Sequence, residues 1–289
     1  MTLVNLKEIL IPARKEKYAV GSFNVLNIQM IKGIIEAAEE ERSPVIVAFA
    51  DRYSKTIPID IVFPAMVKMA KKSKVPVTVH LDHGLSFESI ISALRNNSSG
   101  VMYDGSSLPY DQNVKNTKEI CKVAHAFGIS VEAEIGYVSR EENNDKKNVT
   151  PKEETIYTEP EEALKFIKET NVDALAVSIG TVHGICLEEP KLDFDRLSRI
   201  NEISEVPLVL HGGSGVSEND FKKCIDNGIS KINFFSRTSN AIAESVKNKL
   251  NSLNRKVLYQ DIDPIIYETC KEKVREKIKV FKSNNRVSI

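Results

Sequence analysis

The sequence carries no excess of charge of either sign. Its 289 residues include 40 basic and 40 acidic side chains, which gives a formal net charge of +0 with histidine neutral. Nucleic acids and anionic membranes attract proteins with a basic excess, so we expect neither of them as the main partner. A small molecule is the better expectation for what the protein binds.

The sequence is also poor in cysteine and lacks long apolar runs. Its cysteines show neither C-x-x-C spacing nor the density of a disulfide-bonded scaffold, so we expect reduced thiols at Cys121, Cys186, Cys224 and Cys270. The sequence shows no signal peptide and no apolar run long enough to span a bilayer. We therefore expect a cytoplasmic protein.

Strand-like and helix-like segments alternate along the chain. Continuous apolar runs such as Val45–Ala50 are typical of strands in a parallel sheet, which are buried on both faces. Between them, apolar residues recur at helical spacing, as at Ile31, Ile34 and Ile35. The segments that we interpret as strands are 18–25, 45–50, 75–82, 100–104, 129–136, 172–180, 206–212 and 229–236.

Eight strands separated by helices predict an α/β fold, a (β/α)8 TIM barrel that forms a single domain over residues 1–289. A doubly wound sheet is the alternative. The segment 139–158 is polar without a hydrophobic period, and we predict a long mobile loop there. The C-terminal segment, about 254–289, is expected to add helices to the barrel. The helices are predicted at 28–42, 59–72, 87–96, 113–127, 161–170, 194–203, 218–227, 240–253 and 264–281.

Three of the five histidines lie at or just after the ends of predicted strands, in glycine-containing motifs. The motifs are Val-His-Leu-Asp-His-Gly at 79–84, Ser-Ile-Gly-Thr-Val-His-Gly at 178–184 and Val-Leu-His-Gly-Gly-Ser-Gly at 209–215. Barrel enzymes place their chemistry at the carboxyl ends of the strands. There, the neutral imidazoles of His83, His183 and His211 can hold a divalent ion, with zinc as the first candidate. Three ordinary core histidines are the alternative.

Other polar and glycine residues also gather near the predicted strand ends. Glycines allow backbone amides to approach an anion closely, and phosphate sites in barrels lie after strands seven and eight. The glycines serve only the turns in the alternative interpretation. The residues are Asn24, Asp82, Asp104, Glu134, Gly184, Gly212, Gly213, Ser214 and Asn233 to Ser236.

The motifs together resemble those of the class II, metal-dependent ketose-bisphosphate aldolases. They are Leu-Asp-His, Glu-Ala-Glu-Ile-Gly, Gly-Thr-Val-His-Gly, Leu-His-Gly-Gly-Ser-Gly and Lys-Ile-Asn-Phe. The resemblance runs from Gly-Ser-Phe-Asn at 21–24 to the C-terminal helix, and Asn-Arg-Val-Ser near the C-terminus is most similar to the tagatose-bisphosphate branch. It implies a homo-oligomeric lyase, a homodimer or homotetramer, that releases dihydroxyacetone phosphate from fructose or tagatose 1,6-bisphosphate.

The resemblance implies catalytic roles for three residues. Asp82 would transfer the proton of the aldehyde-derived oxygen, and Glu142 would remove a proton from dihydroxyacetone phosphate, the donor. Asn233 would be the third catalytic residue, at the dihydroxyacetone phosphate site. A solvated charge run is the alternative for Glu142. The histidines of the three motifs would bind the catalytic zinc.

The resemblance also implies further ligand sites. Asp104 and Glu134 match positions that hold a second or alternative metal in some relatives, whereas carboxylates that accept hydrogen bonds from the histidines are the alternative. A monovalent cation near the phosphate is a further expectation. The implied substrate-binding residues are Asn24, Gly184, Gly212, Gly213, Ser214, Asn233, Phe234, Phe235 and Ser236.

Departures from the family pattern concern the loop and the aldehyde. Ser139-Arg140 stands where the family usually has glycines. Asn233 is followed by Phe234-Phe235, where a small or polar residue often stands at the second place. Ala50 stands where fructose-bisphosphate aldolases have a serine that binds the aldehyde's phosphate. Tyr267 stands near the position at which many relatives have an arginine. Arg52 is the nearest replacement cation, or else an ordinary surface arginine. The alternative substrate is a product of an acceptor aldehyde that bears a carboxylate. The alternative functions are a hydrolase that uses zinc-bound hydroxide and a non-catalytic barrel that binds a sugar phosphate.

Overall fold

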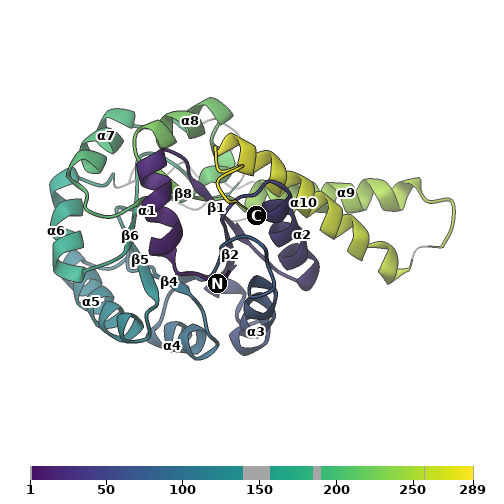
Figure 1. Cartoon of the computed structure of the whole chain (residues 1–289), viewed down its shortest axis with the longest axis horizontal. Helices are drawn as coiled ribbons and strands as arrows, with labels where there is room; N and C mark the ends of the chain where they lie inside the picture. The colour runs from purple at the N-terminus through teal and green to yellow at the C-terminus, as the bar shows by residue number, and fades with distance from the viewer. Residues whose placement is uncertain (1, 139–156, 185–189, 257, 289) are drawn as a thin grey trace, which may run out of the picture.

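The structure is a computed structural model that describes residues 2–138, 157–184, 190–256 and 258–288. Eight parallel strands pair in sequence order, and β8 pairs with β1 to close a barrel (Figure 1). The closed barrel confirms the predicted TIM-barrel fold and excludes the doubly wound sheet. The strands are β1 (Val20–Asn24), β2 (Val45–Ala50), β3 (Val77–Gly84), β4 (Gly100–Tyr103), β5 (Ser130–Ile135), β6 (Ala174–Val177), β7 (Leu208–Leu210) and β8 (Ile229–Asn233).

Helices surround the barrel and pack on the outward faces of the strands (Figure 1). Each of the predicted helices is found, with ends that differ by a few residues. None of the helices in the described part of the chain is long and apolar enough to cross a membrane. The helices after the first are α2 (Ile28–Glu40), α3 (Ile59–Ala70), α4 (Phe87–Arg95), α5 (Tyr110–Ala126), α6 (Pro160–Thr170), α7 (Phe194–Ile203), α8 (Glu218–Asp226), α9 (Ser236–Ser252) and α10 (Asp263–Val280).

The first helix, α1 (Leu6–Glu16), closes the end of the barrel at which the strands begin. It starts with a capping box, in which Asn5 accepts a hydrogen bond from the Glu8 amide and Glu8 accepts one from the Asn5 amide. Leu6 and Leu10 are fully buried and join one apolar cluster with residues of the strands, such as Val20. Because apolar side chains fill this end, polar groups are gathered toward the other.

Alternation along the strands places polar side chains inside the barrel. In β5, Val131, Ala133 and Ile135 belong to the outer core beneath the helices. Glu132 and Glu134 alternate with them and therefore face the barrel interior. The same alternation turns His80 and Asp82 of β3, and Lys231 and Asn233 of β8, toward the interior. These interior side chains fill the barrel toward the carboxyl ends of its strands.

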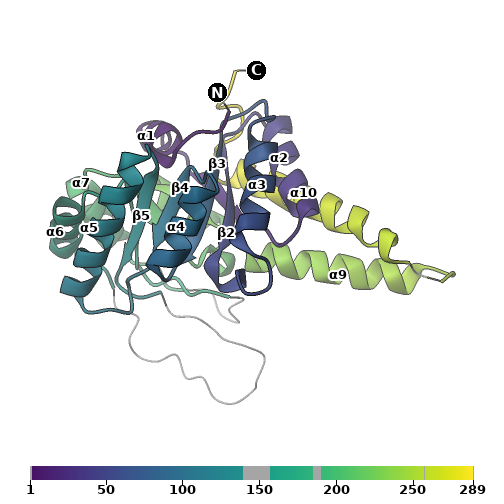
Figure 2. The same ribbon diagram turned by 90° about the horizontal axis from the view of Figure 1, so that it is seen from below.

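The end of β8 differs from its prediction. The strand stops at Asn233, and α9 begins at Ser236, four residues before the predicted helix start at 240. Helices α9 and α10 pack against each other and project from the side of the barrel (Figure 2). Beyond α10, the tail is held by backbone hydrogen bonds, since the amide of Asn285 donates to the Glu41 carbonyl over 2.8 Å.

Candidate metal centre

His83 lies at the end of β3 in an unusual backbone conformation. Its φ is 49°, in the left-handed region that residues other than glycine seldom adopt. The pairing of β3 with β4 also shifts register between Leu81 and Gly84. A hydrogen bond of 2.7 Å joins the Nδ1 of His83 to an Oδ2 of Asp104, which follows β4. Strain of this kind is held in place by surrounding contacts and gathers at functional sites.

The other two histidines are brought together by a close approach of two loops. His183 follows β6, and His211 follows β7 directly. Gly212 has a φ of 68°, and a Cβ atom there would lie 2.8 Å from the carbonyl carbon and oxygen of Val182. A side chain at position 212 would therefore push the His183 loop away from His211.

The three imidazole rings converge edge to face. Their centroids are 4.6 Å apart for His83 and His211, 5.1 Å for His83 and His183, and 5.8 Å for His183 and His211. One ring nitrogen from each lies within 4.8 Å of the others, and Nε2 of His83 is 3.0 Å from Nδ1 of His211. Zinc binds imidazole nitrogens at about 2.0–2.1 Å in a tetrahedral arrangement. Nitrogens this close can share one ion, so the donor set fits a divalent metal.

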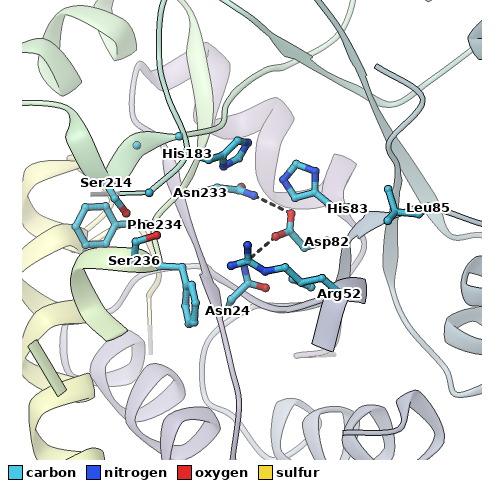
Figure 3. Close-up of a pocket in the computed structure, with 15 residues that line it drawn as sticks. Asn24, Arg52, Asp82, His83, Leu85, His183, Ser214, Asn233, Phe234 and Ser236 are labelled. Carbon is cyan, nitrogen blue, oxygen red and sulfur yellow. Dashed lines mark hydrogen bonds between the residues drawn. The ribbon is translucent and has the colours of Figure 1, made fainter. Parts of the chain in front are cut away.

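Asp82 is held next to these rings by two asparagines. Its Oδ2 accepts a hydrogen bond of 2.8 Å from Asn24 Nδ2 at the end of β1, and its Oδ1 accepts one of 2.9 Å from Asn233 Nδ2 at the end of β8 (Figure 3). The carboxylate is buried, with 2% of its surface exposed. Both oxygens are therefore fixed in direction as well as in position.

The charges around the centre favour a cation. Burial acts to lower the pKa of His83, but Asp82, the hydrogen bond to Asp104 and Glu134 outweigh it and raise that pKa to about 9. Burial acts to raise the pKa of Asp82, but nearby positive groups, His83 first among them, hold it well below its usual range. Burial lowers the pKa of His211, so this ring is neutral. An environment that stabilises a proton on His83 also stabilises a metal ion.

A second group of potential ligands shares His83. Its ring nitrogen and one carboxylate oxygen each from Asp104 and Glu134 lie within 4.8 Å of one another. The Oδ1 of Asp104 also accepts hydrogen bonds from the Ser106 amide and hydroxyl, at 3.2 and 2.6 Å. Asp104 is thus hydrogen-bonded to His83, and its position is also compatible with a second ion.

Glu132 lies beneath the histidines and was missed in the sequence. It is fully buried, and its Oε1 is 2.9 Å from the Nε2 of His211. Burial acts to raise the pKa of Glu132, but Lys231 and the hydrogen bond from His211 lower it to about 2. Its spacing of two from Glu134 on one strand was the available signal, because that spacing puts both carboxylates on one face.

A cavity of about 400 Å³ opens at this end of the barrel. It gathers most of the residues that the sequence indicated, and it adds Leu85, which the sequence did not indicate. Its lining includes Asn24, Ala50, Arg52, Asp82, His83, Leu85, His183, Gly184, Gly212, Gly213, Ser214, Asn233, Phe234, Phe235 and Ser236. The strand-end interpretation of these residues therefore corresponds to one site in space (Figure 3).

One part of the cavity wall offers groups suited to an anion. Helix α9 begins at Ser236, and the first amides of a helix lack partners within it and attract anions. Gly213 packs against β8, where a Cβ atom would lie 2.8 Å from the Asn233 carbonyl oxygen. Phe234 fits this role poorly, because its amide donates to the Ser22 carbonyl over 3.0 Å and its ring is buried beside that of Phe221.

Arg52 also lines the cavity. Its Nη2 donates to the Tyr53 hydroxyl over 2.8 Å, and its guanidinium lies 4.8 Å from the centre of that ring. The Tyr53 ring in turn packs edge-on against Phe235, with centroids 6.1 Å apart. Tyr267 is not among the described lining residues, and its hydroxyl bonds to Glu36 on α2. Glu142 lies outside the described residues.

Comparison with known proteins identifies the family to which this site belongs. The sequence model of the family "Fructose-bisphosphate aldolase class-II" matches residues 4–286. The chain belongs to this family. It is an aldolase, a carbon–carbon lyase, and class II aldolases depend on a metal ion that the three histidines could hold.

Relatives of this class II aldolase match it along nearly the whole chain. The fructose-bisphosphate aldolase of Staphylococcus aureus strain Mu50 is 38% identical over 297 residues, which cover 99% of each chain. The protein YdjI of Escherichia coli K12, named as uncharacterized, is 37% identical over 278 residues and 95% of each chain.

Solved structures agree with the fold of the aldolase. The crystal structure of the YdjI aldolase from Escherichia coli K12 superposes with a TM-score of 0.88 at 35% identity, over 99% of this chain and 100% of the other. A putative fructose-1,6-bisphosphate aldolase from Coccidioides immitis gives 0.87 at 28% identity, over 98% and 97%. These relatives do not single out the tagatose-bisphosphate branch, so the resemblance to that branch bears only on a proposed substrate.

Proposed function

We propose that this class II aldolase reversibly cleaves a ketose bisphosphate, tagatose or fructose 1,6-bisphosphate, to dihydroxyacetone phosphate and an aldehyde. The proposal depends chiefly on the convergence of three imidazoles beside a carboxylate whose two oxygens are both hydrogen-bonded. Tagatose 1,6-bisphosphate is the leading named substrate. A different acceptor, such as an aldehyde that bears a carboxylate, is the alternative.

We propose zinc as the ion and His83, His183 and His211 as its ligands. A bound zinc ion supplies Lewis-acid polarisation of the substrate carbonyl, which acidifies the neighbouring C–H bond. Asp104 would hold His83 in orientation through its hydrogen bond, which leaves Nε2 of that ring for the ion. Asp104 and Glu134 are proposed in addition as ligands of a second divalent ion.

Asp82 is proposed to carry the proton of the aldehyde half. In cleavage, it would accept the hydroxyl proton of the carbon that becomes the aldehyde, and in condensation it would return that proton. The lowered pKa of Asp82 suits the first step, because the carboxylate is already ionised. Asn24 and Asn233 would keep it directed at one oxygen of the substrate.

Glu142 is proposed to exchange the proton of the donor half. When the carbon–carbon bond breaks, its electron pair stays with the three-carbon donor, and Glu142 would return a proton to that carbon. The reverse transfer would start condensation.

The donor phosphate is proposed to bind between the loops after β6 to β8. Gly184, Gly212, Gly213 and Ser214 would offer backbone amides, and Ser236 would offer the first turn of α9. A monovalent cation beside the phosphate is part of this proposal.

The enzyme is further proposed to be a homodimer or homotetramer, which light scattering of the purified protein would determine.

Detritiation of labelled dihydroxyacetone phosphate tests the proposal. The zinc-loaded protein should release tritium from the donor without any aldehyde present, because the proton step precedes condensation. A zinc hydroxide hydrolase or a barrel that only binds sugar phosphates would release none. Absence of exchange by protein shown to contain one zinc per chain would rule out the proposed reaction of dihydroxyacetone phosphate.

A further inference from the structure

A buried ion pair crosses the barrel interior directly beneath the histidine centre. Glu132 on β5 and Lys231 on β8 both have no exposed side-chain surface. The Nζ of Lys231 is 2.9 Å from Oε1 and 2.7 Å from Oε2 of Glu132. Because the ammonium contacts both oxygens, it keeps the carboxylate ionised and fixes its plane.

The same carboxylate determines which nitrogen of His211 carries the proton. Its Oε1 lies 2.9 Å from Nε2 of His211, and an ionised carboxylate can only accept a hydrogen bond. The proton must therefore be on Nε2, which leaves the lone pair on Nδ1. That atom is 3.0 Å from Nε2 of His83, on the side of the metal centre.

His83 is held in the opposite way. Asp104 contacts its Nδ1 over 2.7 Å, so the nitrogen that faces the centre is Nε2. One ligand thus uses Nδ1 and the other uses Nε2, and a different carboxylate selects each. A ring of His211 with its proton on Nδ1 would point an N–H group at the ion in place of a lone pair.

We infer that Glu132, itself held by Lys231, is a positioning residue that keeps the Nδ1 lone pair of His211 directed at the metal ion. The inference rests on the proposed function for the presence of an ion at the three histidines. It assigns Glu132 no contact with substrate. Its consequence is that Glu132 sets the affinity of the enzyme for its metal.

The alternative role for Glu132 is to fill the barrel as a purely structural ion pair. The chain contains a more exposed group of the same three charge types away from the centre. Asp173, directly before β6, contacts His125 Nε2 over 2.8 Å and Lys7 Nζ over 3.0 Å, so it joins a carboxylate, an imidazole and a lysine, and it also accepts a hydrogen bond from the Val131 amide over 2.7 Å. Asp173 is also buried, with 7% of its surface exposed. Asp173→Asn is therefore a control for loss of a carboxylate between an imidazole and a lysine.

The first test measures zinc affinity by competition with a chromophoric chelator. Glu132→Gln should bind zinc about 10- to 100-fold more weakly than the wild type, the range typical of lost hydrogen bonds to ligating histidines. Asp173→Asn should retain the wild-type affinity. Wild-type affinity in Glu132→Gln, or an equal loss in Asp173→Asn, would overturn the inference.

The second test uses the wild-type protein and does not depend on a variant that folds. In the zinc-loaded enzyme labelled with ¹⁵N in its five histidines, NMR should show His211 with its proton on Nε2 and His83 with its proton on Nδ1. A proton on Nδ1 of His211 would overturn the inference. His83→Gln and His211→Gln assign the signals.

The two proposals can fail separately. If zinc affinity falls in Glu132→Gln but the wild-type enzyme releases no tritium from the donor, the inference about Glu132 stands and the proposed reaction of dihydroxyacetone phosphate fails. If the wild type exchanges the donor proton and Glu132→Gln binds zinc normally, the proposed reaction stands and the role of Glu132 is wrong.

Discussion

The Nδ2 of Asn233 lies 2.9 Å from Oδ1 of Asp82, and this hydrogen bond joins the end of β8 to the end of β3. These residues are 151 positions apart in the sequence, and closure of the barrel brings them together. Asn24 binds the other oxygen of the same carboxylate over 2.8 Å. With both oxygens held, Asp82 can face a substrate hydroxyl without a change of rotamer.

The first prediction separates the two proton transfers. Asp82→Ala should slow carbon–carbon cleavage by about 10²-fold or more, the usual size of a lost acid–base group. It should leave tritium release from dihydroxyacetone phosphate largely intact, since the Asp82 proton belongs to the aldehyde half. Parallel assays of cleavage and exchange on the same preparation measure both effects. Loss of both activities together would mean that Asp82 mainly orients the metal site.

The second prediction concerns pH and metal affinity. The pKa of His83 is raised to about 9, so between pH 7 and 9 this ring carries a proton before zinc binds. Zinc must displace that proton, and the affinity should therefore fall about tenfold for each unit by which the pH decreases in this window. Calorimetry at pH 7.5 in buffers of different ionisation enthalpy should show close to one proton released per zinc. Binding without proton release would contradict the raised pKa.

The fold and most of the cavity follow from local sequence patterns. Continuous apolar runs identify strands such as Val45–Ala50, which is buried along its whole length, and polar residues at or after the strand ends identify the end of the barrel that carries the cavity. Asn24, Asp82 and His83 could be assigned in this way because each lies at the end of the strand that places it. The position and direction of a strand determine where the side chains at its end lie.

Pairings between distant strands could not be predicted in the same way. Nothing near Glu132 in the sequence indicates that its partners would be Lys231, 99 positions away, and His211, 79 positions away. Likewise, the interruption after Asn233 is too short to indicate that a helix starts at Ser236. Tyr267 stands near the position of an arginine in many relatives, and packing of α10 on α2 directs its hydroxyl to Glu36, a contact between residues distant in the sequence.

The third prediction concerns the metal ligands. Chelation should abolish activity, and zinc or cobalt should restore it, while His83→Ala, His183→Ala and His211→Ala should each lose the ion. His125→Ala is the matched control, because His125 is a partly buried histidine that contacts Asp173 away from the centre. Metal content by mass spectrometry and cleavage rates measure the effects. Full activity in excess chelator after verified removal of the metal would show that the site is wrongly assigned.

The fourth prediction concerns the donor proton. Glu142→Ala should slow tritium release from dihydroxyacetone phosphate by about 10²-fold or more, as expected for a lost general base. Metal content should remain unchanged. Glu141→Ala, the neighbouring acidic residue, is the control and should exchange at the wild-type rate. Equal rates of tritium release in Glu142→Ala and the wild type would mean that Glu142 is a solvated surface charge without a catalytic role.

The last prediction concerns the acceptor aldehyde. Ala50 cannot donate a hydrogen bond to a second phosphate, and Tyr267 does not line the cavity, which leaves Arg52 as the cation on this side among the described lining residues. A guanidinium binds phosphate or carboxylate through paired hydrogen bonds, so Arg52→Ala should raise the KM of an anionic aldehyde about tenfold or more and change kcat little. Condensation of dihydroxyacetone phosphate with a panel of phosphorylated, carboxylated and uncharged aldehydes measures this effect.

The uncharged aldehydes are one control and should show no change of KM in Arg52→Ala. Lys55→Ala is the second control and should behave as the wild type, because Lys55 is an exposed neighbour that is not among the described lining residues. If fructose 1,6-bisphosphate is cleaved far faster than every alternative and Arg52→Ala leaves the acceptor KM unchanged, Arg52 is a surface residue and another group binds the acceptor.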